Sequence, residues 1–208
     1  YFIRMFGVTG GYHRYFSHRA FKTSRAFAFT LACIAQSSAQ RGAIWWASNH
    51  RHHHRYSDTE KDLHSPDQQG LFYAHVGWLW NERSYQEHQN VEDLKRCPEL
   101  VFLNNYPMLP AIALGVLTWL TLGWSGLVHG FGISTIFLFH GTFTINSLTH
   151  VWGSRRYDTS DSSRNNLWLA LITLGEGWHN NHHRYMRSAR QGFFWWEIDI
   201  TFYVLWIL

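Results

Sequence analysis

The sequence has few cysteines and few charged residues. Its 208 residues include only Cys33 and Cys97, which excludes a disulfide scaffold or a cysteine-based zinc site. Charged residues make up 15% of the chain, against about 25% in an average soluble protein. Histidine and aromatic residues are abundant instead, with 15 histidines and 18% Phe, Trp and Tyr. This balance excludes a disordered chain, a coiled coil and a collagen-like repeat, and the length suits one domain over residues 1–208.

The shortage of charge is greatest between residues 100 and 154, where no Asp, Glu, Lys or Arg occurs. One membrane helix needs about 20 apolar residues, so we predict two spanning helices, over residues 101–122 and 127–151. The glycine-containing segment 123–126 would form the turn between them. A pair of buried helices in a soluble core is the alternative, but a chain of this size cannot enclose two such helices on all sides.

Other apolar stretches are shorter. Residues 26–40 carry no charge, and their length is compatible with either a re-entrant helix or a crossing. Further apolar segments cover residues 167–174 and 193–208. Because both ends of the chain fall inside apolar stretches, we expect a protein truncated at both ends.

The basic residues lie outside the predicted spans, mainly in residues 14–25, 51–96 and 155–190. A two-helix hairpin leaves and returns on the same side of the membrane, and the positive-inside rule makes that side cytoplasmic. We therefore expect an all-α membrane helical bundle with a histidine-rich cap on its cytoplasmic face. The net charge of +4 follows from this face and requires no nucleic-acid partner.

The histidines are concentrated in three short boxes. The boxes contain, in order, His13 and His18, then His50, His53 and His54, then His179, His182 and His183. In the second and third boxes, the i, i+3, i+4 spacing places three imidazoles on one face of a helix. In the first box, a spacing of five turns the rings about 140° apart on an α-helix. His150 lies four residues after Asn146 and shares its helix face.

Clustered imidazoles predict metal binding. Imidazole is a ligand for zinc, iron, copper or nickel, and eight box histidines with His150 exceed the four ligands of one tetrahedral zinc site. The natural division is two metal ions with four or five nitrogens each. So many neutral ligands favour a redox-active iron centre over zinc, although spacing alone leaves the metal open.

The order and spacing of these boxes around a membrane hairpin resemble the membrane fatty acid desaturases. The resemblance is closest to the acyl-CoA Δ9 (stearoyl-CoA) branch and covers nearly the whole chain. Supporting segments are residues 10–14 (GGYHR), 75–78 (HVGW), 146–150 (NSLTH) and 175–179 (GEGWH). The resemblance implies that the family's first membrane helix and most of its second precede this sequence.

The resemblance also implies a non-haem centre of two iron ions. Its ligands would be His13, His18, His50, His53, His54, His150, His179, His182 and His183, with Asn146 acting through a bound water. The implied reaction uses O2 and two electrons to remove two hydrogens from adjacent methylenes of an acyl chain. A cis double bond and water are the products.

The same resemblance assigns residues to the substrate. The bend of the acyl tunnel in this branch is shaped by residues that match Gln40, Trp46 and Thr142, which favours insertion at Δ9. At the headgroup side, Ser48 and Asn49 stand where animal enzymes carry Arg and Asp, and Glu82 replaces a basic residue. Asn49 would then contact the substrate. Acyl-CoA is the expected carrier, but fewer cations meet the phosphates of CoA, so acyl-lipid and acyl-ACP stay open as alternatives.

No electron-delivery domain is evident, so the resemblance implies a separate donor: a ferredoxin, a rubredoxin or a cytochrome b5-like protein. Basic residues available to dock an acidic donor are Arg51, Arg55, Arg184, Arg187 and Arg190, although a solvated positive-inside face explains the same charges. Two rival functions stay open. One is a related membrane di-iron hydroxylase or alkane monooxygenase, and the other is a non-catalytic membrane metal-binding or transport protein.

Overall fold

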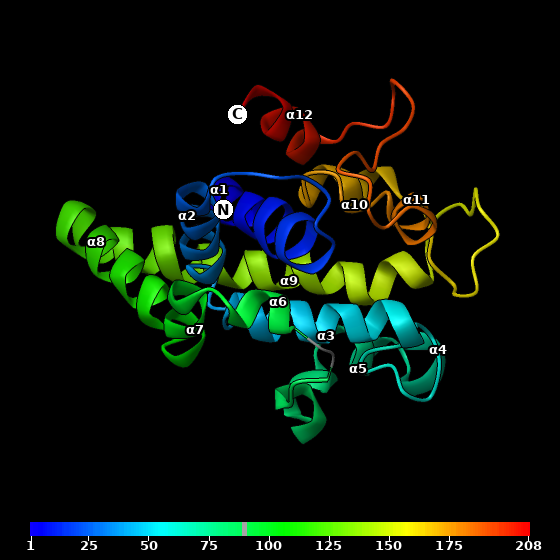
Figure 1. Cartoon of the computed structure of the whole chain (residues 1–208), viewed down its shortest axis with the longest axis horizontal. Helices are drawn as coiled ribbons and strands as arrows, with labels where there is room; N and C mark the ends of the chain where they lie inside the picture. Colours follow the sequence, from blue (N-terminus) through cyan, green and yellow to red (C-terminus); the bar gives the residue numbers. More distant parts are fainter. Residues whose placement is uncertain (89–90) are drawn as a thin grey trace.

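A computed structural model describes residues 1–88 and 91–208. Within these ranges the chain forms helices and loops without a β-strand, and isolated bridges join Asn165 to Ser154 and Trp178. This confirms the predicted all-α fold (Figure 1). In chain order, the elements are α1 (Phe2–Phe6), η1 (Gly7–Ser17), α2 (Arg25–Gln36), α3 (Ala43–Tyr56), α4 (Pro66–Gln69), α5 (Leu71–His75), η2 (Gly77–Trp80), η3 (Glu82–Tyr85), α6 (Glu92–Lys95), α7 (Pro98–Asn105), α8 (Leu109–Ser125), η4 (Gly126–Ile133), α9 (Ser134–Ser147), η5 (Leu148–His150), α10 (Leu167–Ile172), α11 (His179–Arg184) and α12 (Ile200–Ile207).

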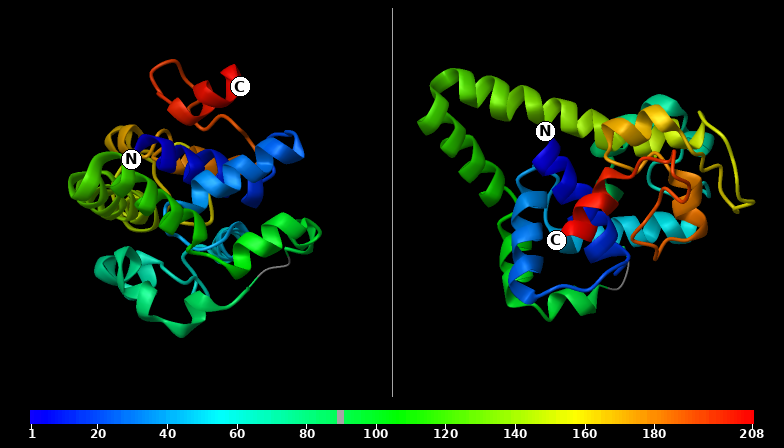
Figure 2. Two further views of the ribbon diagram at one scale, coloured as in Figure 1. Left: turned by 90° about the vertical axis from the view of Figure 1, so that its left-hand side faces the viewer. Right: turned by 90° about the horizontal axis from the view of Figure 1, so that it is seen from above.

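The apolar stretch Leu109–His150 is the one helical stretch among the described residues that is long and apolar enough to cross a membrane. It is broken at Gly123, whose φ of 64° and ψ of −154° are accessible mainly to glycine. The predicted turn therefore falls where the helix is interrupted, and α8 and α9 diverge from it as the arms of a V (Figure 2). Large apolar side chains on both arms are exposed, Leu120 by 71% and Phe137 by 65%, which is typical of an interaction surface for lipid or protein.

The first predicted span is wrong in its extent. The expected helix over residues 101–122 is divided into α7, which ends at Asn105, and α8, which begins at Leu109. Pro107 lies in the gap, and proline disfavours helix both at its own position and at the residue before it. Pro110 lies in the first turn of α8, where its missing N–H costs nothing.

The helix η1 passes through the middle of the molecule. It packs against α2, α3 and α12, and its Tyr12 and Phe16 side chains are fully buried. The approach to α2 is close because η1 begins with Gly7, where a Cβ atom would lie 2.6 Å from the backbone nitrogen of Ala35. This central position brings the first histidine box into the interior.

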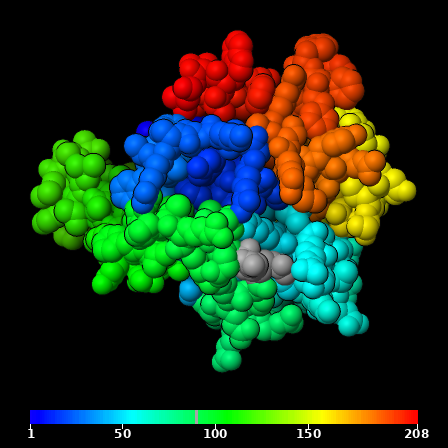
Figure 3. All heavy atoms as spheres, in the orientation of Figure 1, coloured from blue at the N-terminus to red at the C-terminus, as the bar shows by residue number. Residues whose placement is uncertain are grey.

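The remaining boxes reach the same region from distant parts of the chain. Figure 3 shows the segment around residues 180–190 lying beside the N-terminal segment and close to α3. A cavity lined by Ser17, Arg51 and Met186, among others, confirms that these three segments meet. The predicted apolar segment 193–208 is helical only in its last part, as α12.

Candidate metal centre

Helices α3 and α11 each carry one complete histidine box. α3 presents His50, His53 and His54 near its end. α11 consists almost entirely of the third box, with His179 as its first residue. The helical spacing expected from the sequence is therefore present in both boxes. The three imidazoles of one box do not converge on one point, however, because His53 belongs to a different group from His50 and His54, and His182 to a different group from His179 and His183.

The first box departs from the expected geometry because η1 is a π-helix. Its hydrogen bonds close over five residues, as when the N–H of His18 donates to the carbonyl oxygen of His13 at 3.2 Å. In this wider turn, residues five apart lie on the same face. The ring centroids of His13 and His18 are 4.8 Å apart. The prediction that these rings point about 140° apart, which assumed an α-helix, is wrong.

The nine predicted ligands form two groups. The five-histidine group consists of His13, His18, His50, His54 and His182, and the four-histidine group of His53, His150, His179 and His183. Within each group, the candidate ligand nitrogens all lie within 4.8 Å of one another. This division matches the four or five nitrogens per metal ion expected from the sequence.

The arrangement of ring nitrogens fits a bound cation. His54 Nε2 lies 3.0 Å from His50 Nε2 and 2.9 Å from His182 Nε2, and His50 Nε2 lies 2.8 Å from His18 Nε2. One imidazole nitrogen carries either one proton or one lone pair, so a nitrogen with two such neighbours cannot satisfy both through hydrogen bonds. Several lone pairs that converge on one point have a metal ion as their natural common partner.

Burial keeps these imidazoles neutral. It lowers the pKa of His18, His50 and His54 well below the usual value, and the neighbouring imidazoles add to the effect. The pKa values of His179 and His182 are lowered in the same way. Neutral imidazole is the form that binds metal, so the site favours the ligating state before any ion enters.

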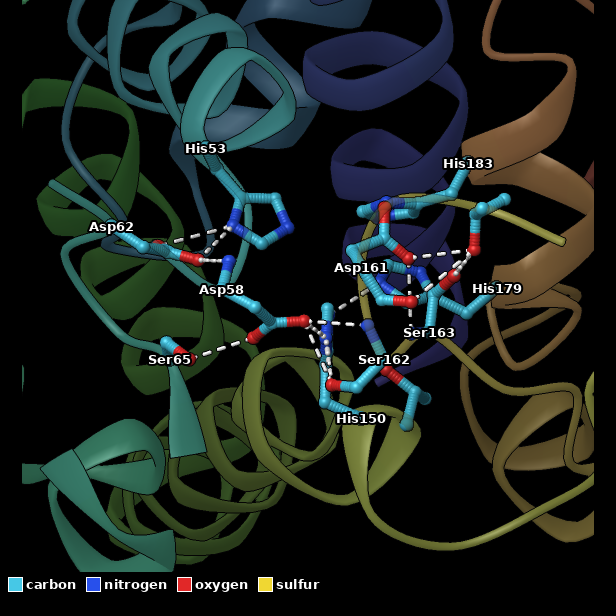
Figure 4. A network of polar contacts seen from close by, with 12 residues as sticks. His53, Asp58, Asp62, Ser65, His150, Asp161, Ser162, Ser163, His179 and His183 are labelled. Carbon is cyan, nitrogen blue, oxygen red and sulfur yellow. Dashed lines mark hydrogen bonds and ion pairs between the residues drawn. The ribbon is translucent and has the colours of Figure 1, made fainter. Parts of the chain in front are cut away.

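Four carboxylates lie behind the histidines and accept from the Nδ1 atoms. In the five-histidine group, His13 Nδ1 lies 2.5 Å from Glu176. The four-histidine group has three such pairs (Figure 4): His53 with Asp62 at 3.2 Å, His150 with Asp58 at 2.9 Å, and His183 with Asp161 at 2.6 Å. An Nδ1–H that donates to a carboxylate fixes the ring and leaves the Nε2 lone pair free for a metal.

These carboxylates are ionised. Burial raises the pKa of Asp58, Asp62 and Asp161, but the hydrogen bonds and charges of their histidine partners outweigh it and hold each pKa below the usual range. For Glu176, burial also raises the pKa, and His13 and Arg14 together lower it to about 2. The outer layer of the centre is therefore anionic.

Sequence reasoning missed this outer layer. Asp58 and Asp62 follow His54 by four and eight residues, a proximity that was a usable signal. Asp161 lies in a loop with no recognisable sequence pattern, and no sequence pattern marked Gln191 either. Gln191 is fully buried, and its side-chain amide lies 3.4 Å from His182 Nδ1 and 3.5 Å from His13 Nδ1.

A buried ion network connects the five-histidine group to the C-terminal helix. Arg14 lies 2.9 Å from both Glu176 and Asp199, and all three side chains are buried. Asp199 also caps α12 by accepting from the backbone N–H of Phe202 at 3.0 Å. The orientation of His13 thus depends on a relay that begins at α12.

An apolar cavity of about 440 Å³ ends against the five-histidine group at His50. Its lining includes Gln40, Trp46 and Thr142, the three residues expected to shape an acyl tunnel. Gln40 Nε2 donates to Thr142 Oγ1 at 3.0 Å. Trp46 stacks on His50, with ring centroids 4.9 Å apart. The structure therefore brings together three residues from distant positions that only the family resemblance connected.

Two further predicted residues, Asn49 and Asn146, also line this apolar cavity. Asn49 donates to the carbonyl oxygen of Trp45 at 3.0 Å, and its Oδ1 has no hydrogen-bond partner among the described residues. Asn146 lies on the cavity wall one turn before His150 and outside both histidine groups. Glu82 is exposed at the start of η3 and does not line the cavity.

Comparison with known sequences agrees with this architecture. The family model described as Fatty acid desaturase matches residues 1–203. The chain belongs to the fatty acid desaturase family.

Curated relatives of this desaturase chain carry matching names. It is 41% identical over 204 residues to the Icosanoyl-CoA 5-desaturase of Limnanthes douglasii, covering 96% of this chain but only 57% of the relative. It is 39% identical to the Delta-9 acyl-lipid desaturase 2 of Arabidopsis thaliana, covering 99% and 68%. It is 38% identical to the sn-1 stearoyl-lipid 9-desaturase of Anabaena variabilis, covering 97% and 75%. The chain thus spans little more than half the length of the Limnanthes relative.

The desaturase chain has a second, basic cavity that reaches the five-histidine group, also of about 440 Å³. Its lining includes His18 and His54. The cations around it are Arg19, Arg51, Arg55 and Arg187. Two residues of the predicted basic face, Arg184 and Arg190, do not line it. The five-histidine group is therefore reached by an apolar cavity at His50 and by an arginine-lined cavity at His18 and His54.

Proposed function

We propose that this chain is the core of a fatty acyl desaturase that inserts a cis double bond, at the Δ9 position, into a saturated acyl chain. In the balanced reaction, one CH2–CH2 pair, O2, two electrons and two protons give one CH=CH unit and two waters. The observation that carries the proposal is the apolar cavity, which runs between Gln40, Trp46 and Thr142 and ends at His50. One desaturase domain would cover residues 1–208.

The proposed cofactor is a pair of iron ions, one in each histidine group. When bound, the ions and O2 would supply the oxidising power that unactivated methylenes require. All nine grouped histidines would hold them, with Asn146 acting through a water. The outer carboxylates keep the imidazoles oriented, and the buried surroundings keep them neutral.

The cavity residues position the substrate. The Gln40–Thr142 hydrogen bond ties the segment after α2 to α9 and fixes one wall. Trp46, held between Tyr12 and His50, forms another. A fixed apolar wall holds one pair of methylenes near the metal ligands and excludes water from the reacting carbons. This geometry supports a defined double-bond position.

The acyl carrier has two candidates. Acyl-CoA is the carrier expected from the sequence resemblance. However, Arg41 is the one Lys or Arg side chain in the described lining of the apolar cavity, and it stacks on Trp45 and Tyr85 at 5.2 and 4.4 Å. A single cation offers little to the several phosphates of CoA. This observation favours an acyl chain carried on a membrane lipid as the second candidate.

We further propose that the exposed apolar arms α8 and α9 lie in the lipid bilayer and that the histidine groups face the cytoplasm. A separate donor of ferredoxin, rubredoxin or cytochrome b5-like type would deliver electrons. The basic cavity, which reaches His18 and His54, supports an acidic partner on that side.

The decisive experiment is gas chromatography–mass spectrometry of fatty acids from a host that expresses the full-length protein. The expected result is a new cis-Δ9 monoene that is absent from a His182→Ala control. Feeding labelled stearoyl-CoA or labelled glycerolipid to isolated membranes would identify the carrier. Hydroxylated chains would favour a hydroxylase or alkane monooxygenase. One zinc per chain without O2 consumption would favour a metal-binding or transport protein.

A further inference from the structure

We infer that the two metal positions are electrostatically unequal and that the four-histidine group binds its divalent cation more tightly and fills first. This inference rests on the proposed function for the identity of the ions and adds an order of loading. It follows from the charges that surround each group and from how those charges are compensated.

Three aspartates whose side chains are at most 8% exposed surround the four-histidine group, and none of their carboxylates pairs with a Lys or Arg among the described residues. Asp58 accepts from His150, from the backbone N–H and hydroxyl of Ser162, and from Ser65 (Figure 4). Asp161 accepts from His183 and from the hydroxyl of Thr159. These partners are imidazoles, hydroxyls and backbone amides, which orient the carboxylates but leave their charge uncompensated.

The third aspartate follows the same pattern. Asp62 accepts from His53 Nδ1 and from the backbone N–H groups of Asp58 and His64. It is almost completely buried. Three full negative charges therefore lie one imidazole away from the position of the first ion.

The five-histidine group has a weaker anionic environment. Its one adjacent carboxylate, Glu176, is shared with Arg14, and Arg14 also pairs with Asp199. These three groups together carry one net negative charge. Arg51 lies close by, donating to the backbone carbonyls of residues 16 and 17, and it shares Asp93 with Arg19, so these three groups carry one net positive charge. The net charge of the six groups near the five-histidine group is therefore about zero, against three negative charges at the other.

The number of ligands acts in the opposite direction, since the five-histidine group offers one more nitrogen. The fifth nitrogen takes a coordination position that a water can fill at the four-histidine group. The gain in metal affinity from this one nitrogen is therefore modest. Loss of a single outer-layer partner typically costs 10–100-fold in metal affinity, and the four-histidine group has three charged partners to the other group's one. The charge difference therefore decides the order.

Unequal affinity has a functional consequence. When metal is scarce, chains with only the four-histidine group filled would accumulate, and these lack half of the centre. Activity would then rise with the occupancy of the five-histidine group alone. The weaker site would set the metal concentration at which the protein works.

The test is an anaerobic titration of the metal-free full chain in detergent with Fe²⁺, followed by equilibrium dialysis and native mass spectrometry. Two binding steps are expected, separated by at least tenfold in affinity. His54→Ala should retain the tight step, and His179→Ala should retain only the weak one. Two steps of equal affinity, or loss of the tight step in His54→Ala, would overturn the inference.

Charge variants test the cause. Asp161→Asn should weaken the tight step by 10–100-fold and leave the weak step, whereas Glu176→Gln should affect only the weak step. Asp158→Asn, a change at an exposed position three residues away, is the matched control and should alter neither. If Asp161→Asn fails to fold, Asp58→Asn carries the same expectation. An unchanged tight step in a folded aspartate variant refutes the electrostatic argument.

These results are independent of product formation. A protein that binds two ions in unequal steps but makes no unsaturated product contradicts the proposed function and leaves the loading order intact. A protein that makes the product with two equivalent ions contradicts only the loading order.

Discussion

The buried network of Arg14, Glu176 and Asp199 leads to a quantitative prediction about stability. Asp199 is fully buried and pairs with Arg14 at 2.9 Å. Replacing Asp199 by Asn keeps the side-chain shape and its oxygen cap on α12 but removes the charge, and it replaces the oxygen that accepts from the backbone N–H of Gln191 at 2.7 Å with an NH2 group. Breaking a buried pair costs 3–5 kcal/mol, and Arg14 retains Glu176, so we expect a loss of about 3 kcal/mol, the lower end of that range.

Asp199→Ala removes the cap as well as the charge. Loss of a helix N-cap costs about 1 kcal/mol, so the total loss should be about 4 kcal/mol. In a protein of this size, 1 kcal/mol corresponds to roughly 2–4 °C in Tm. The expected falls in Tm are therefore about 6–12 °C for Asp199→Asn and about 8–16 °C for Asp199→Ala.

Intrinsic tryptophan fluorescence during heating of the purified protein in detergent measures these shifts. Asp158→Asn, at an exposed position, is the control and should change the free energy of unfolding by less than about 0.5 kcal/mol. A Tm for Asp199→Asn equal to that of the control would mean that Asp199 carries no structural charge pair. Equal values for the Asn and Ala variants would mean that the α12 cap contributes nothing.

Three further predictions concern the centre and the apolar cavity. Thr142→Val removes the acceptor of the Gln40 amide and should spread the double bond over neighbouring carbons. Mass spectrometry of dimethyl disulfide adducts would show these double-bond positions. A single unchanged position refutes the positioning role. His182→Ala should lower the metal content below two ions per chain, measured by elemental analysis, while the protein still inserts in membranes. A full metal content would argue against a place for His182 in the five-histidine group. In metal-free protein, burial lowers the pKa of His183 to about 4 from a usual 6.5, so the unfolded chain binds the proton first as pH falls. Stability should be intact above pH 6.5 and decrease toward pH 4 by about 3 kcal/mol from His183 alone, and by more because the other buried histidines act in the same direction. Urea titrations that are flat across this window would contradict it.

The part of the centre that the sequence predicted is the part governed by local periodicity. The second and third boxes lie on α-helices, where i, i+3 and i+4 share a face, so both boxes face the centre, although each is divided between the two histidine groups. The geometry of the first box was predicted wrongly because η1 is a π-helix, and no local signal distinguished it from an α-helix. The proline at position 107 indicated the break between α7 and α8, but the absence of charge across this region favoured one continuous helix in the prediction.

The outer layer could not be derived from local pattern, because its contacts are long-range. Asp58 meets His150 across 92 positions, and Asp161 meets His183 across 22. The contact between Gln40 and Thr142 spans 102 positions and was anticipated only through resemblance to a known family. Charge and hydrogen-bonding capacity are visible in a sequence, but the partner that satisfies them is a property of the tertiary fold.

The wide separation of the ligands also bears on how the protein is made. His13 meets His182 across 169 positions, and the relay that holds His13 ends at Asp199. A nascent chain on the ribosome therefore contains the first two boxes before the third has been synthesised. The five-histidine group is complete only once residue 182 has been synthesised, and the four-histidine group only once residue 183 has, so full metal loading is a late event in synthesis.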